Sequence, residues 1–133
     1  MIIDTHVHIG KMVGFNMRES DVLYAMEHYG IDFSLVSNIE CAEFSGKCRK
    51  VPRVFQKPQN KVLRKTIEFA RENPDKIGVL VWAKLFSEEP DEEFEQLIRD
   101  NRDIIYGMKF HPFHSLTAPD SEKAEPYYEM YKK

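Results

Sequence analysis

The stretch Met1–Ile9, MIIDTHVHI, is the most informative for the fold, because its pattern predicts a strand that begins with apolar residues and ends with polar ones. Side chains two apart in a strand point to the same face, so His6 and His8 share a face and Val7 packs on the other. Two neutral imidazoles side by side can hold one divalent cation such as zinc. The alternative is a pair of surface histidines on an edge strand. The position of the pair at the end of the first strand favours metal ligands, with Asp4 one step back as a hydrogen-bond partner for a ligand ring.

Beyond this stretch, short apolar runs alternate with helical patterns. Helices are expected over Glu19–Gly30, Lys61–Asn73, Asp91–Asn101 and Ser121–Lys133, and further strands over Asp32–Ile39, Ile77–Phe86 and Ile104–Phe113. Four strand-helix units in this order predict an α/β fold with a parallel sheet and right-handed crossovers. That order fits a doubly wound sheet or half of a (β/α) TIM-barrel. The segment after the first strand, His8–Met12, is not a G-x-G-x-x-G loop, which disfavours nucleotide binding.

A second constellation lies in the last predicted strand, where Lys109 and His111 also differ by two positions. A lysine inside an apolar strand is costly unless it is paired or functional. Lys109 could be a carboxylated metal bridge, a charge partner for a substrate, or half of a structural ion pair. His111 could be a ligand, a proton shuttle or a hydrogen-bond partner of the substrate. His114 lies in a loop past Pro112 and is a weaker candidate, and His28 is expected only to complement a helix dipole.

Composition excludes several classes of protein. The 133 residues carry a formal net charge of −3, which gives no general argument for binding nucleic acid or an anionic membrane. No apolar run reaches the roughly 18 residues that span a bilayer, and no signal peptide is visible. Cys41 and Cys48 are too few for a disulfide framework, so free thiols and a cytoplasmic location are expected. The loop from Ala42 to Lys61 has six basic residues against Glu43, which favours an anionic substrate or leaves a solvated loop.

The segments IIDTHVHIG and GMKFHP resemble the amidohydrolase superfamily, most closely its metal-dependent hydrolases and decarboxylases, which include aminocarboxymuconate-semialdehyde decarboxylase. The resemblance implies that His6 and His8 are metal ligands and that Lys109 occupies the position of a bridging carboxylated lysine in binuclear members. It implies a divalent metal, zinc or alternatively manganese, and a metal-activated water that attacks a small substrate. GMKFHP differs from the glutamate-containing fourth strand of the similar metal-dependent deoxyribonucleases.

The resemblance also bears on domain organisation. Members of the superfamily take further ligands from the fifth, sixth and eighth strands, whereas residues 1–133 supply four βα units of a barrel that needs about 250 residues. We therefore expect one partial barrel domain that acts with a second copy or with the missing half. The alternative is a non-catalytic half-barrel that binds metal or self-associates through its open edges.

Overall fold

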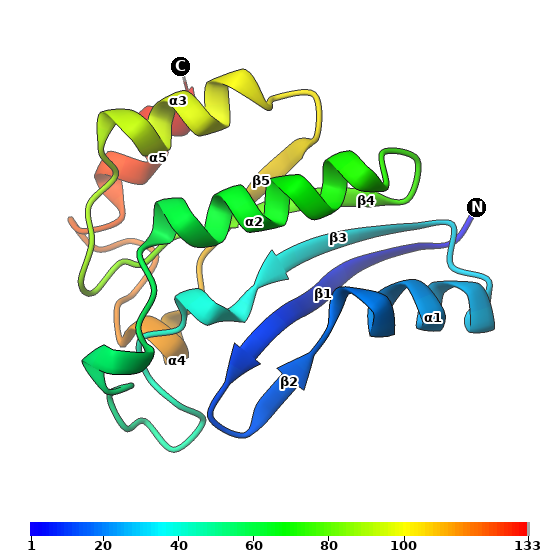
Figure 1. Cartoon of the computed structure of the whole chain (residues 1–133). Helices are drawn as coiled ribbons and strands as arrows, with labels where there is room; N and C mark the ends of the chain where they lie inside the picture. The colour runs from blue at the N-terminus through cyan, green and yellow to red at the C-terminus, as the bar shows by residue number, and fades with distance from the viewer. Residues whose placement is uncertain (133) are drawn as a thin grey trace.

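The computed structural model describes residues 1–132 and contains one five-stranded sheet (Figure 1). The strands are β1 (Ile3–Met12), β2 (Phe15–Met17), β3 (Phe33–Asn38), β4 (Ile77–Trp82) and β5 (Ile105–Lys109), in the spatial order β2-β1-β3-β4-β5. The helices are α1 (Glu19–Tyr29), α2 (Gln59–Glu72), α3 (Glu92–Asp100), α4 (Pro112–Ser115) and α5 (Glu125–Lys132), with 3₁₀ turns η1 (Ile39–Cys41) and η2 (Arg53–Phe55).

The predicted α/β fold with a parallel sheet is confirmed. β1, β3, β4 and β5 pair in parallel and follow chain order, without the reversal that defines a doubly wound sheet. The sheet is open, so it has two edges where a barrel would have none. The sheet shares the order of its parallel strands with half of a barrel, but it does not close.

Local sequence explains where the helices begin and end. Gly30 ends α1 in the left-handed conformation, as its position after the apolar pattern predicted. The Asp91 side chain accepts a hydrogen bond from the Phe94 backbone N–H and so caps α3. In α2 the predicted apolar face is buried, including Leu63 and Ile67, and this helix packs on β3 and β4 (Figure 1).

The two faces of the sheet differ in burial. Val36, Val79 and neighbouring residues on the face that the helices cover are fully buried. On the opposite face Tyr106 is 57% exposed and Ile3 is 49% exposed. The Tyr106 ring packs edge-on against Phe33 at 5.4 Å between centroids. The part of this face around Ile3, Phe33 and Tyr106 is therefore apolar, and no helix covers it within residues 1–132.

Several predicted boundaries were wrong. Strand β4 was predicted to extend to Phe86 but ends at Trp82. Strand β5 was predicted to extend to Phe113 but ends at Lys109, because Pro112 begins the short helix α4. The antiparallel strand β2 was not predicted, since its three residues are too short to show a period. The last helix begins at Glu125 instead of Ser121, and Lys133 lies outside the described residues.

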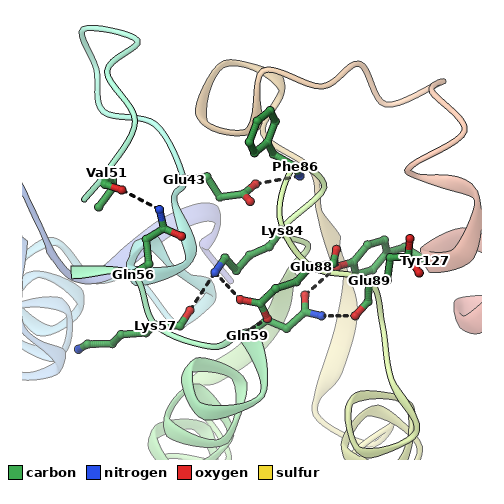
Figure 2. A network of polar contacts seen from close by, with 10 residues as sticks. All are labelled: Glu43, Val51, Gln56, Lys57, Gln59, Lys84, Phe86, Glu88, Glu89 and Tyr127. Carbon is green, nitrogen blue, oxygen red and sulfur yellow. Dashed lines mark hydrogen bonds and ion pairs between the residues drawn. The ribbon is translucent and has the colours of Figure 1, made fainter. Parts of the chain in front are cut away.

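A buried lysine ties together the loops beyond the ends of β3 and β4 (Figure 2). Lys84 Nζ pairs with Glu88 and donates to the Lys57 carbonyl at 3.0 Å. Glu88 also accepts from the Gln59 backbone N–H at 2.9 Å, and the Tyr127 hydroxyl donates to the Gln59 side chain at 2.8 Å. The network therefore fixes the start of α2, the segment after β4 and α5 against one another.

Glu43 is a buried carboxylate beside this network, and it predicts a pH-dependent stability. Burial raises its pKa, against hydrogen bonds from the Phe86 N–H and from Ser87. A carboxyl group whose pKa is raised by folding does not destabilise the protein at a pH well below its ordinary pKa of 4.5, where it is protonated in both states. The loss of folding free energy grows as the pH rises above that value. Glu43→Gln should therefore melt near the wild-type temperature at about pH 4 and above it at about pH 7, as measured by circular dichroism. Glu68→Gln, at an exposed position on α2, is the control. A difference in melting temperature that does not change with pH would contradict this assignment.

Candidate functional site

The two first-strand histidines meet at their ring nitrogens. His6 Nε2 and His8 Nε2 lie 3.1 Å apart, with the rings edge to face. The β1–β3 pairing is irregular between Asp4 and Val7, and this segment includes His6. Irregularities of this kind change the direction in which side chains point. His8 Nδ1 lies 2.8 Å from the hydroxyl of Ser37 on β3. This contact fixes the His8 ring and leaves its Nε2 directed at His6.

The spacing of the two nitrogens suits a shared cation. Two imidazole nitrogens bound to one tetrahedral zinc at about 2.0–2.1 Å lie roughly 3.3–3.4 Å apart, close to the observed separation. Within residues 1–132, however, no group of three or more histidine, cysteine, aspartate or glutamate side chains could hold a metal ion. The described residues therefore offer two imidazole nitrogens at this spacing and no third such ligand beside them.

Lys109 joins the pair from the other edge of the sheet. Its Nζ lies 3.0 Å from His6 Nε2, although β5 and β1 are separated by β3 and β4. Side chains stand roughly perpendicular to a sheet, so these two would not meet above a flat one. The contact indicates that the sheet curls toward this side, and three nitrogens from three side chains converge there.

Trp82, at the end of β4, links this group to His111. Its indole stacks on the His111 ring at 5.6 Å and 13°, and it contacts the His8 ring at 5.6 Å. His111 is the residue before α4 and not part of the strand, so the prediction that it shares a strand face with Lys109 was wrong. His114 lies 4.3 Å from the His111 ring, and its Nδ1 is 2.5 Å from the Phe44 carbonyl oxygen. His114 is thus bound to a backbone carbonyl.

Burial and the charges of neighbouring side chains favour the neutral forms of His8 and His111. Burial, followed by the charges of Lys109, His6 and His111, lowers the pKa of His8 to about 4, although Ser37 opposes the shift. Burial and then His114 lower the pKa of His111, and burial lowers that of Lys109. Neutral imidazole is the form that binds metals.

The structure brings His6, His8 and Lys109 together, and the Trp82 ring separates His111 from His8. Asp4 does not contact a histidine ring, and its carboxylate accepts the His6 backbone N–H at 3.0 Å instead. His28 lies on α1, stacked on Tyr24. Sequence reasoning missed Ser37 and Trp82. The two-residue period of DFSLVSNI could have placed Ser37 at the polar end of its strand, beside the end of β1.

Comparisons with known proteins give a fold and no family. No protein-family model and no curated protein matches the sequence. A solved structure of a probable 2-pyrone-4,6-dicarboxylic acid hydrolase from Acinetobacter baumannii, with citric acid bound, is similar to the chain with a TM-score of 0.55 and 12% identity. The match covers 97% of this chain and 45% of that one, so the chain spans less than half the length of the structure it resembles. At this identity the likeness concerns the fold.

Across residues 1–132, no helix is long and apolar enough to cross a membrane.

Proposed function

We propose that this chain supplies the first-strand metal ligands of a metal-dependent hydrolase or decarboxylase of the amidohydrolase type, with zinc or alternatively manganese as the ion. The convergence of His6 Nε2 and His8 Nε2 at 3.1 Å, near the carboxyl end of a parallel strand, carries the proposal. Ligands and active sites of parallel α/β folds gather at this end. The fold likeness to a probable hydrolase supports the same reaction class.

Each side chain has a distinct role in this proposal. His6 and His8 bind the ion, and Ser37 holds the orientation of the His8 ring. Lys109 carries positive charge to the ligand pair and attracts an anionic substrate group, and His111 exchanges a proton with the substrate from its stack on Trp82. When bound, the ion acts as a Lewis acid and makes hydroxide available near neutral pH. The remaining ligands and the general base come from outside these residues.

The single tryptophan gives a direct test of metal binding. Trp82 contacts the His8 ring, so Co²⁺ bound to His6 and His8 should quench its fluorescence. Chelator-treated protein should take up Co²⁺ and release it to Zn²⁺, and elemental analysis should find metal in the purified chain. The double variant His6→Ala/His8→Ala should lose both signals, and His28→Ala should keep them. Unchanged quenching in the double variant, or no uptake by the wild type, would overturn the proposal.

Ser37→Ala should weaken metal binding at the same site without abolishing it. Removal of the Oγ that contacts His8 Nδ1 leaves both ligands present but frees the His8 ring. Loss of such an outer partner costs about 10–100-fold in metal affinity. The affinity for Co²⁺ should fall by that factor, as measured by Trp82 fluorescence, with the same final quenching at saturation. Wild-type affinity would show that Ser37 does not position His8.

The apolar open face favours a second candidate function, that of a self-associating or metal-binding half-barrel without catalysis. Ile3, Phe33 and Tyr106 lie on a face that no described helix covers, and β5 has a free edge. We propose that a second copy, or the other half of a barrel, covers this face in either function. Sedimentation should give twice the 15.7 kDa mass for the chain alone, and Tyr106→Glu should return it to monomer while Tyr24→Glu on α1 should not. A monomeric wild-type chain would exclude self-association.

A further inference from the structure

A pocket lies between the β1–β2 hairpin and the loop that precedes α2. It has a volume of about 490 Å³, within the range of small-molecule sites. Its lining residues are Lys11, Met12, Val13, Gly14, Glu40, Ala42, Val51, Val54, Phe55 and Lys57. Six of these side chains are apolar, and three of the six are unusually exposed at the rim: Val54 at 82%, Val13 at 64% and Phe55 at 62%. Exposed apolar side chains gathered around a concavity mark a binding surface.

Lys57 is held at both ends on the wall of this pocket. Its Nζ lies 2.8 Å from the carboxylate of Glu40, whose side chain is almost fully buried. Its backbone carbonyl accepts a hydrogen bond from the buried Lys84 (Figure 2). Beside it, the Gln56 side chain donates to the Val51 carbonyl at 2.6 Å and closes the loop on itself. The ammonium group is therefore placed before any ligand arrives, which lowers the entropy cost of binding.

The charges of the lining favour an anion. Lys11 and Lys57 contribute two positive charges against the one negative charge of Glu40, and Glu40 is occupied by Lys57 and by the Lys11 backbone N–H at 3.3 Å. A carboxylate at the Lys57 ammonium leaves an apolar body against Val51, Val54 and Phe55. A cation or a wholly polar anion would leave those side chains without a partner.

From these contacts we infer that the pocket binds a carboxylic acid with an aryl or branched apolar body. The inference deepens the proposed function by naming a substrate class. It rests on that function only for the claim that the bound acid reacts at the histidine pair. Met12 and Ala42 of the pocket wall belong to the same apolar cluster as Trp82, whose ring contacts His8 and His111. The pocket and the histidine pair thus share a packed wall.

Binding of simple probes to the metal-free chain tests the inference. The probes are phenylacetate, its neutral analogue phenylacetamide, acetate and inorganic phosphate, each titrated calorimetrically into chelator-treated protein. Phenylacetate should bind at least about tenfold more tightly than each of the others, because it alone satisfies both the ammonium groups and the apolar wall. Equal binding of phenylacetamide would remove the charge argument, and equal binding of acetate or phosphate would remove the apolar one. Either result, or no binding of phenylacetate, overturns the inference.

Two variants and a matched control locate the binding. Lys57→Gln and Phe55→Ser should each weaken phenylacetate binding at least about tenfold. Because Lys57→Gln leaves the buried Glu40 carboxylate without its ammonium partner, thermal melts of both variants set the temperature at which the folded proteins are titrated. Lys47→Gln removes a charge from the same loop outside the pocket and should leave the affinity unchanged. Equal losses for Lys47→Gln and Lys57→Gln would show a general charge effect and overturn the inference. These titrations contain no metal, so they test the pocket even if the chain takes up no metal. Likewise, a failure of the probes to bind does not affect the test of metal uptake.

Discussion

Lys84→Met should destabilise the protein by about 3–5 kcal/mol, the usual cost of removing one partner of a buried ion pair. The Lys84 side chain is 3% exposed, and methionine nearly preserves its volume while deleting its charge and its hydrogen bonds. Two acceptors lose their donor, namely the Glu88 carboxylate and the Lys57 carbonyl. Chemical denaturation followed by far-UV circular dichroism measures the change in unfolding free energy.

The cost of Lys84→Met should come mainly from the charge that it leaves behind. The double variant Lys84→Met/Glu88→Gln removes both charges, and glutamine can still accept the Gln59 backbone N–H. It should therefore recover a large part of the stability lost in Lys84→Met.

The pair Glu95–Arg99 is a matched control, since it has the same i,i+4 spacing on an exposed helix face. Arg99→Met should cost less than about 1 kcal/mol. An equal cost for Lys84→Met and Arg99→Met would contradict the role of Lys84 as a buried anchor.

How much the sequence revealed depends on whether a feature is periodic. The alternation of Asp4, His6 and His8 predicted a shared face, and the rings do meet. Lys109 was singled out because a charge inside an apolar strand demands a partner, but its meeting with His6 depends on the curl of the whole sheet, which no local pattern encodes. Ser37 and Trp82 were missed for a similar reason, since each contacts His8 on another strand.

The same distinction explains the errors in the fold. Helix α2 has a clear 3.6-residue period over fourteen residues, and its buried face was predicted correctly. Strand β4 was extended past Trp82 because Ala83 to Phe86 continue an apolar run, and Lys84 within that run looked like a strand residue. The partners of Lys84, namely Glu88 and the Lys57 carbonyl, lie in segments without a periodic pattern. A network of this kind is visible only in three dimensions.

Gly10→Ala should cost about 2–6 kcal/mol, because two independent penalties coincide at one residue. Gly10 has φ +103°, a conformation that side chains rarely adopt, and a Cβ there would lie 2.3 Å from the Asn38 Oδ1 and 2.7 Å from the Glu40 Cγ. Gly14→Ala separates the two penalties, since its φ is +82° with no atom within 4 Å of the added Cβ, and it should cost about 1–3 kcal/mol. Denaturant titrations of both variants give the difference.

The steric part of the Gly10→Ala effect should also reach the pocket. Asn38 Oδ1 accepts the Glu40 backbone N–H at 3.0 Å, and Glu40 in turn holds the Lys57 ammonium at 2.8 Å. A methyl group at Gly10 displaces both side chains, so Gly10→Ala should weaken phenylacetate binding by at least about tenfold in conditions where the variant remains folded, whereas Gly14→Ala should weaken it less. Equal losses of stability in the two variants would show that Asn38 and Glu40 yield to the methyl group at no cost. Unchanged probe binding in folded Gly10→Ala would show that the position of Glu40 does not govern Lys57.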